Sequence, residues 1–186
     1  MASTTLGSAP PASAATSYPI DYTVNATTTL AKLHQTVTVP PGSFIGSLNL
    51  KTFVLTGNLS LPPASTTVSL AGIGLATATF ELSATKPVTG KVDIKTLQVT
   101  ATASFNVLVT SVKPLGLPIN LVGNSCGTST PVSVTFSGKL SLKASSAFSG
   151  TYTIPPLKTC GLATPALNLL IPGPGNVFSA SFVPAT

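Results

Sequence analysis

Apolar and hydroxyl-bearing residues alternate with a period of two along most of the chain. Between residues 22 and 27, Tyr, Val and Ala alternate with Thr, Asn and Thr. The segments 53–61, 76–83 and 132–143 repeat this alternation, with Leu, Ala, Val or Phe at most of the alternate positions. Because successive side chains of a strand point to opposite faces, the pattern predicts antiparallel strands with one apolar and one hydroxyl-bearing face.

Proline- and glycine-rich segments separate the alternating stretches. They lie at residues 40–42, 62–63, 86–90, 115–118 and 155–156. Breaks at this spacing predict an all-β fold, an antiparallel sandwich or barrel of about eight to ten strands.

The alternation changes parity near Thr96. Val92 and Ile94 are the apolar positions of their segment, whereas from Leu97 to Val109 the apolar residues are odd-numbered. A shift of one residue sends every side chain to the other face, so we expect a bulge or bend in a long strand at this point. Long bulged strands favour a barrel or a strongly twisted sandwich over a flat one.

One short helix is predicted near the C-terminus, over Ala166–Ile171. Thr164 is a suitable N-cap residue, Pro165 suits the first helical position, and the Pro-Gly-Pro-Gly segment at 172–175 ends the helix. The apolar helix is either a plug at one end of the β-structure or a lid over a cavity. The candidate lid residues are Leu167, Leu169, Leu170 and Ile171.

Charged residues make up only 6% of the chain, against about 25% in an ordinary soluble domain. They are nine lysines and three carboxylates, and 29 Thr and 22 Ser supply the polar faces instead. A hydrophobic content of 43% is too high for a solvating disordered chain, and no apolar run predicts a transmembrane segment. We expect a single β-domain over residues 19–186, preceded by a flexible linker over residues 1–18.

The two cysteines, Cys126 and Cys160, bear on the cellular compartment. In a weakly charged chain rich in Thr and Ser they favour a disulfide and an oxidising compartment, the alternative being two buried free thiols. No basic segment followed by an apolar one follows Met1. We therefore expect a secreted or envelope-associated protein whose export signal has been removed, the alternative being a leaderless cytosolic protein.

The residue types that usually perform catalysis are few and dispersed. His34 has no serine elbow near it in the sequence and is expected at the surface. Asp21, Glu81 and Asp93 each lie on the polar side of their segments, which favours solvated charges over a catalytic pair. None of these residues shows the spacing of metal ligands, and no glycine-rich phosphate loop is found. We expect no catalytic residue, no metal site and no cofactor.

The net charge of +6 comes from dispersed lysines in a chain without Arg or Trp. Such a chain lacks the bidentate contacts and aromatic side chains of nucleic-acid interfaces, so we expect no nucleic-acid partner. Weak attraction to an anionic cell-envelope polymer is the better interpretation of the charge.

A further sequence pattern extends from residue 124 to residue 176. Its parts are Asn-Ser-Cys-Gly-Thr at 124–128, Thr-Pro-Val-Ser at 130–133, Phe-Ser-Gly at 136–138, Gly-Thr-Tyr-Thr-Ile-Pro-Pro at 150–156, Cys-Gly at 160–161 and Leu-Leu-Ile-Pro-Gly-Pro-Gly-Asn at 169–176. The pattern resembles a group of exported β-rich proteins of actinobacteria whose function is unknown. This resemblance implies export, a Cys126–Cys160 disulfide and an all-β domain, and it implies no substrate or site.

Two functional hypotheses follow from the sequence. The first is a non-enzymatic exported binding protein for an apolar small molecule or lipid at the cell envelope, which the curved sheet, the apolar helix and the scarcity of catalytic groups favour. The second is a structural or self-associating surface protein, for which a hydroxyl-rich and weakly charged exterior is suitable.

Overall fold

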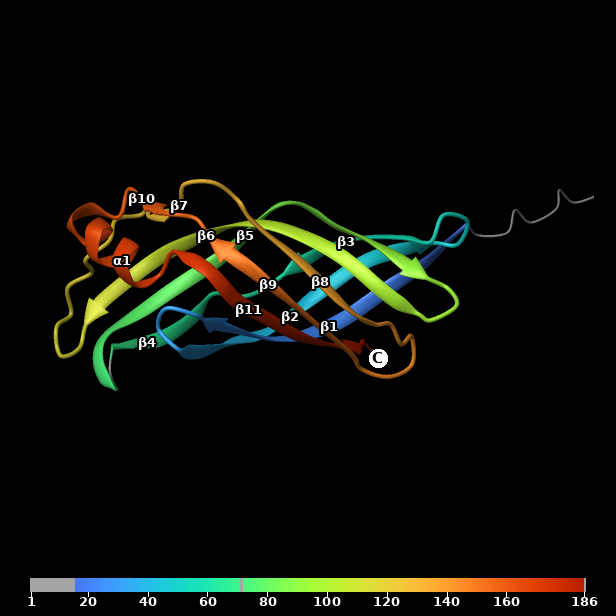
Figure 1. Cartoon of the computed structure of the whole chain (residues 1–186), viewed down its shortest axis with the longest axis horizontal. Coiled ribbons are helices and arrows are strands. Elements are labelled where there is room, and N and C mark those ends of the chain that lie inside the picture. The colour runs from blue at the N-terminus through green and yellow to red at the C-terminus, as the bar shows by residue number, and fades with distance from the viewer. Residues whose placement is uncertain (1–15, 71, 186) are drawn as a thin grey trace, which may run out of the picture.

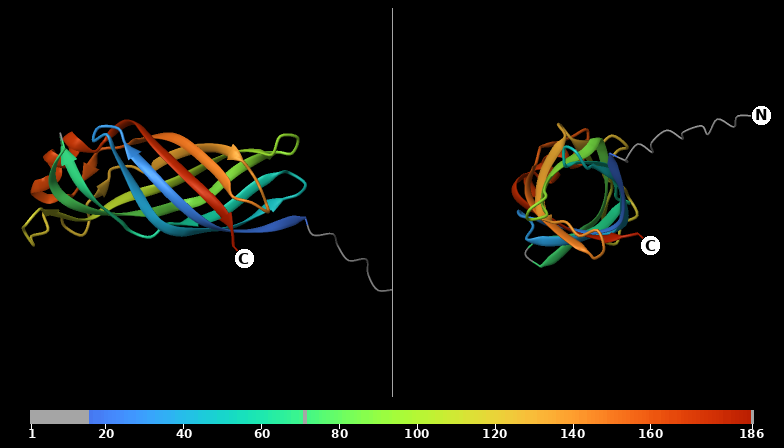
Figure 2. Two further views of the ribbon diagram at one scale, coloured as in Figure 1. Left: turned by 90° about the horizontal axis from the view of Figure 1, so that it is seen from below. Right: turned by 90° about the vertical axis from the view of Figure 1, so that its right-hand side faces the viewer.

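The computed structural model describes residues 16–70 and 72–185. The strands form an elongated, closed antiparallel barrel with a short helix at one end (Figure 1), and they outline a ring when the barrel is viewed along its axis (Figure 2). The prediction of an all-β fold with one short C-terminal helix and one disulfide is confirmed, and the barrel alternative is the one observed.

Eight strands form the closed wall, and each pairs antiparallel with its neighbours. In order around the barrel they are β1 (Ser17–Leu30), β2 (Gln35–Asn49), β3 (Val54–Ser60), β5 (Ile73–Asp93), β6 (Gln98–Pro114), β8 (Val132–Lys139), β9 (Ser146–Ile154) and β11 (Gly173–Pro184). Pairing of β11 with β1 closes the barrel. The additional short strands are β4 (Ala64–Leu70), β7 (Gly127–Thr128) and β10 (Leu157–Lys158).

The two ends of the barrel differ in what covers them. One end, here called the helix end, carries a 3₁₀ turn (Gly161–Ala163), the helix α1 (Thr164–Leu170) and the irregular loop 115–126 between β6 and β7 (Figure 1). The opposite end, here called the turn end, carries the turns at 50–53 and 94–97. Among the described residues no helix is long and apolar enough to cross a membrane.

Strand alternation fills the barrel interior as the sequence predicts. In β1 every second residue from Ile20 to Thr28 is buried, and the residues between them are exposed or half-buried. In β8 the same holds for Val132, Val134 and Phe136. Apart from Thr28, the Ser and Thr residues of both strands therefore form the outer face, which explains how so few charges suffice to cover the barrel.

Aromatic rings fill the turn-end half of the interior. The ring of Phe182 meets those of Tyr22, Phe44 and Phe148 edge-to-face, with centroids 6.1, 5.8 and 5.1 Å apart. Phe136 contacts Phe148 in the same way at 6.0 Å. Edge-to-face contacts add stability beyond the area they bury, so this half of the barrel is both apolar and closely packed.

The prediction of a bulge or bend within a long strand near Thr96 is wrong. β5 ends at Asp93, β6 begins at Gln98, and the backbone N–H of Leu97 donates to the carbonyl oxygen of Asp93 at 2.7 Å. Leu97 has a φ of 59°, so the chain reverses in a tight turn. The change of parity therefore arises because two paired strands are joined by this turn, and Ile94 is exposed in the turn instead of lying in the core.

Two of the expected strand breaks were also wrong. Residues 40–42 lie inside β2 and residues 86–90 lie inside β5. At both places the pairing register shifts: between Val24 and Ala26 of β1 opposite the prolines, and between Lys86 and Thr89 of β5. Proline has no backbone N–H to donate to the neighbouring strand. A bulge interrupts the ladder at that point, so the strand can continue through the proline.

The ends of two other predicted elements shift by a few residues. The N-cap of α1 is Ala163, and the Thr164 hydroxyl donates to the carbonyl oxygen of Gly161 at 2.9 Å because a 3₁₀ turn precedes the helix. Ser17 and Tyr18, predicted to belong to the linker, are paired in β1. Residues 1–15 of the predicted linker lie outside the described residues.

Gly57 of β3 lies directly beneath an aromatic ring of the core. A Cβ atom at this position would lie 2.5 Å from Cζ of Phe44 and 2.8 Å from the carbonyl oxygen of Ile45. The residue opposite it on β2 is Gly46. A Cβ atom at Gly46 would lie 2.4 Å from the carbonyl oxygen of Thr56. Both strands therefore need glycine here, β3 because the Phe44 ring occupies the space of a side chain and β2 because the backbone of β3 does.

We expect Gly57→Ala to lower the free energy of unfolding by about 1–3 kcal/mol, because the added methyl group overpacks the interior. Gly123→Ala is the matched control, since a Cβ there would meet no atom within 4 Å. Urea unfolding of the two variants measures the difference. Equal stability of both variants would contradict this view of the barrel wall.

Candidate functional site

An apolar cavity of about 70 Å³ lies in the helix-end half of the barrel. Seven strands line it, namely β1, β2, β4, β5, β6, β9 and β11, together with Leu33 of the β1–β2 turn and Ile171, which follows α1. The lining includes Val68, Ala78, Phe80, Val109 and Tyr152. The voids among the aromatic rings of the other half hold about 20 Å³ each. The interior is thus unevenly filled, and the larger space lies under the helix end.

The wall beside this cavity contains an interval without strand pairing. β2 pairs with β3 over Ser43–Leu48, and β4 pairs with β5 along its whole length. In the described part of the chain, residues 35–42 of β2 have no paired partner on β4. Val39 of β2 and Val68 of β4 line the cavity from the two sides of this gap, which we call the β2–β4 interval.

The side chain of Gln35 bridges the β2–β4 interval. Its Nε2 donates to Oγ1 of Thr66 at 2.8 Å and to the carbonyl oxygen of Thr67 at 2.5 Å. Its Oε1 is buried and has no hydrogen-bond partner among the described residues. An amide side chain therefore takes the place of a backbone ladder at the helix-end margin of the interval.

Three hydroxyl groups interrupt the apolar lining of the cavity: that of Thr66, which accepts from Gln35, and those of Tyr152 and Thr28. The hydroxyls of Tyr152 and Thr28 lie 2.5 Å apart, and Thr28 donates its proton to the carbonyl oxygen of Val177 at 3.2 Å. Tyr152 is consequently the donor toward Thr28. Burial raises the pKa of the Tyr152 phenol, and a hydrogen bond from the Thr28 hydroxyl to the ionised phenolate offsets a smaller part of this rise. The Tyr152–Thr28 pair is neutral, and the other described residues that line the cavity are uncharged as well.

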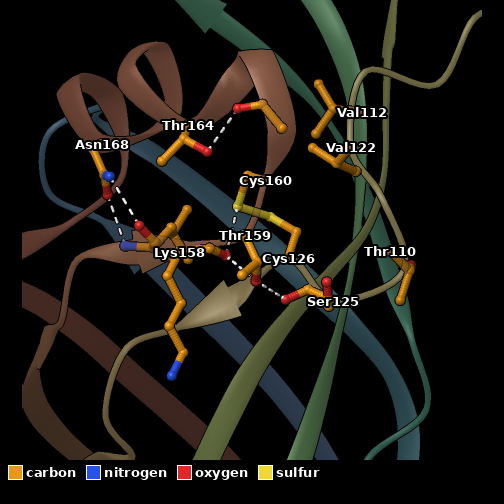
Figure 3. Close-up of a disulfide and its surroundings, with 12 residues drawn as sticks. Thr110, Val112, Val122, Ser125, Cys126, Lys158, Thr159, Cys160, Thr164 and Asn168 are labelled. Atoms are coloured by element: carbon orange, nitrogen blue, oxygen red, sulfur yellow. Dashed lines mark hydrogen bonds between the residues drawn. A yellow bond between two sulfur atoms is a disulfide. The ribbon is translucent and has the colours of Figure 1, made fainter.

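The helical segment is fixed to the barrel by a disulfide and by a side-chain amide. Cys126 and Cys160 are bonded and fully buried, with an S–S distance of 2.01 Å (Figure 3). Asn168 of α1 accepts from the backbone N–H of Leu157 at 2.7 Å and donates to its carbonyl oxygen at 2.9 Å. The amide thus pairs with β10 as a neighbouring strand would.

The four candidate lid residues occupy different environments. Leu167 is buried in a second apolar cluster with Val112 and Val122, and Ile171 is half-buried and lines the cavity. Leu170 is half-buried, and Leu169 is 75% exposed. The structure therefore brings one of the four residues to the cavity.

The buried amide of Asn176 is a structural residue that the sequence reasoning missed. Its Oδ1 accepts from the backbone N–H of Ala31 at 3.0 Å, and its Nδ2 donates to the carbonyl oxygen of Gly173 at 2.8 Å. It is only 1% exposed. An asparagine beside Pro-Gly-Pro-Gly reads as a turn residue, so nothing in the sequence distinguishes it from exposed asparagines.

The dispersed polar residues of the sequence stay apart in the fold. His34 is exposed in the β1–β2 turn with a φ of 50°. Asp21 and Asp93 lie toward the turn end, and Glu81 is half-buried in the middle of β5. The backbone N–H of Lys95 donates to Asp93 and holds the pKa of that carboxyl below its usual value. In the described residues no three His, Cys, Asp or Glu side chains are grouped as metal ligands.

No family model matches the chain, and searches of curated proteins and of solved structures find no match either. The geometry of the cavity and of its wall is therefore the basis for a functional argument.

The phenol of Tyr152 makes the stability depend on alkaline pH. Because burial raises its pKa in the folded state, its stabilising contribution is complete below the unfolded value of about 10 and is lost as pH rises above it. At pH 7 we expect Tyr152→Phe to lower the free energy of unfolding by about 0.5–1.5 kcal/mol, through loss of the bond to Thr28. Above pH 10 this difference should shrink, as measured by urea unfolding. Tyr18→Phe, at an exposed position, should show no such change.

The disulfide closes a loop of 34 residues, which in the chain-entropy model stabilises the fold by about 3–4 kcal/mol. We expect the double variant Cys126→Ala/Cys160→Ala to lose about this amount in urea unfolding. The wild type in reducing buffer should show the same loss, and the double variant should not respond to the reductant. Unchanged stability of the double variant would contradict a structural role for the bond.

Proposed function

We propose that the protein is a non-enzymatic exported protein that binds an apolar, lipid-like ligand in the helix-end cavity. The observation that carries the proposal is the unfilled apolar space in one half of a barrel whose other half is packed with aromatic rings. Core packing normally leaves few voids larger than a water molecule. An apolar space of about 70 Å³ favours an apolar occupant over water, since water needs several polar partners.

The size of the cavity bears on how a ligand would enter. Ligand pockets usually measure about 300–1,000 Å³, several times the space of about 70 Å³ in the closed barrel. The closed barrel accommodates a short apolar segment, and a longer chain requires the wall to move apart. The β2–β4 interval is a place where such movement breaks few bonds, because the Gln35 side chain bridges strands that have no backbone ladder there.

The chemistry of the lining supports a neutral ligand. The polar groups that it offers include the Tyr152 and Thr28 hydroxyls, which are already paired with each other. An ionised ligand group buried there would lack a counter-charge and would be strongly disfavoured. An uncharged hydrocarbon chain or ring is therefore the ligand class that we propose.

The proposed setting is outside the cytosol. The Cys126–Cys160 disulfide is compatible with an extracellular location, because such bonds persist in oxidising compartments. The hydroxyl-bearing outer faces of the strands also suit a protein that remains folded with few charges.

We expect Ala78→Leu to weaken binding of the neutral fluorescent probe N-phenyl-1-naphthylamine at least about tenfold, because the added carbons occupy the cavity. The matched control Ala147→Leu carries the same change on the exposed face of β9 and should bind as the wild type does. Probe titration measures both, and native mass spectrometry identifies an apolar passenger.

Two results would contradict the proposal. One is equal probe affinity of Ala78→Leu and the wild type. The other is a wild type that takes up neither probe nor passenger and forms oligomers with rising concentration, which would favour the structural, self-associating alternative.

A further inference from the structure

The most exposed apolar side chains are concentrated at the helix end. Eight Ile and Leu residues are more than half exposed among the described residues, and six of them lie at this end. We call these six the helix-end rim: Ile73, Leu115, Leu117, Ile119, Leu162 and Leu169. Leu162 is 100% exposed and Leu169 is 75% exposed. Monomeric proteins rarely expose so many large apolar residues together without an interaction that covers them.

The helix-end rim is continuous between its three segments. The backbone N–H of Leu115 donates to the carbonyl oxygen of Leu75 at 3.2 Å, which joins the loop 115–126 to the start of β5. At the other end of the rim, the carbonyl oxygen of Leu121 lies 3.7 Å from where a Cβ of Gly161 would be. The loop therefore connects the β4–β5 turn with the helical segment, as the grouping of these elements in Figure 1 also indicates.

Lysines border the helix-end rim, whereas carboxylates are remote from it. Nζ of Lys32 donates to the carbonyl oxygen of Leu169 at 3.3 Å, and Lys113 precedes Leu115 by two residues. Lys158 is exposed on β10 beside the disulfide (Figure 3). The carboxylate nearest to the rim along its own strand is Glu81, eight residues or about 26 Å from Ile73.

The turn end differs in both respects. Only Ile45 and Ile94 of its apolar residues are more than half exposed, since others such as Leu50 and Leu142 are 45% exposed, and its lysines are accompanied by both aspartates of the chain. The difference matters because apolar groups bordered by cations alone match a surface that is negatively charged outside and apolar beneath.

We infer that the helix-end rim docks on the surface of an anionic phospholipid bilayer. The six apolar side chains reach the acyl-chain boundary, and Lys32, Lys113 and Lys158 contact the phosphate groups around them. A second copy of the chain fits less well, because face-to-face contact of two rims would bring the lysines of both copies together without a carboxylate between them. The inference does not depend on ligand binding by the cavity.

The absence of Trp from the sequence allows a direct test. Leu162→Trp places a single fluorophore in the rim, and Ile94→Trp places one at the turn end as the control. With vesicles of phosphatidylcholine and phosphatidylglycerol in equal parts, Leu162→Trp should shift its emission to shorter wavelength and be quenched by brominated lipid. Ile94→Trp should show neither effect.

Charge and apolar contributions can be separated with matched variants. Because each lysine near an anionic surface contributes about fivefold to partitioning, Lys113→Gln/Lys158→Gln should weaken vesicle binding about 25-fold. Lys95→Gln/Lys139→Gln, with the same net charge, should leave binding within about twofold of the wild type. Leu162→Ser should weaken binding at least about tenfold. Co-sedimentation with the same vesicles measures all three.

Each other outcome overturns the inference. A lack of shift in Leu162→Trp, or equal shifts in both Trp variants, excludes docking through this end. A shift that depends on protein concentration and not on vesicles makes the rim an interface between copies. If both double lysine variants lost vesicle affinity equally, binding would depend on the net charge of the protein and not on the helix-end rim. Ala78→Leu should retain vesicle binding, so failure of the cavity proposal is distinguishable from failure of this one.

Discussion

Closure of the sheet by β11 against β1 is the constraint on which the rest of the structure depends. A closed barrel gives each wall strand two neighbours and sends every second side chain into one enclosed space. That space has a fixed girth, so the sum of the inward side chains must fill it. The small residues of the wall, such as Gly57 beneath Phe44, show how closely inward volume is adjusted where large rings are present.

The two halves of the barrel meet this constraint differently. In the turn-end half, the rings around Phe182 fill the interior. In the helix-end half, the wall is divided into β3 and β4 by Pro62 and Pro63, and part of the interior stays empty. The elements that cover this half are held by the disulfide and by the amide of Asn168. These bonds between covering segments stabilise the helix-end half, where the interior is less completely packed. The unfilled space, the unpaired interval and the apolar rim all lie in this same half of the molecule.

The sequence predicts the strand faces well, because burial inside a barrel enforces a period of two on residues such as Val132, Val134 and Phe136. It predicts the existence of α1 from local signals, including Pro165. It does not distinguish a turn from a bulge near Thr96, because both change the parity by one residue. Nor does it show that β2 continues through its prolines, since a bulge depends on the partner strand. The sequence could not predict the cavity, because its volume depends on the sizes of residues brought together from seven strands and two connecting segments.

The uneven filling of the barrel has a consequence for its mechanical behaviour. Unfolding eliminates internal voids and so reduces the volume of the system, by an amount that scales with the void volume, and the larger void of this barrel lies in the helix-end half. Hydrostatic pressure therefore acts on one half of this barrel more than on the other. The aromatic half is the less compressible part, and the helix-end half yields first.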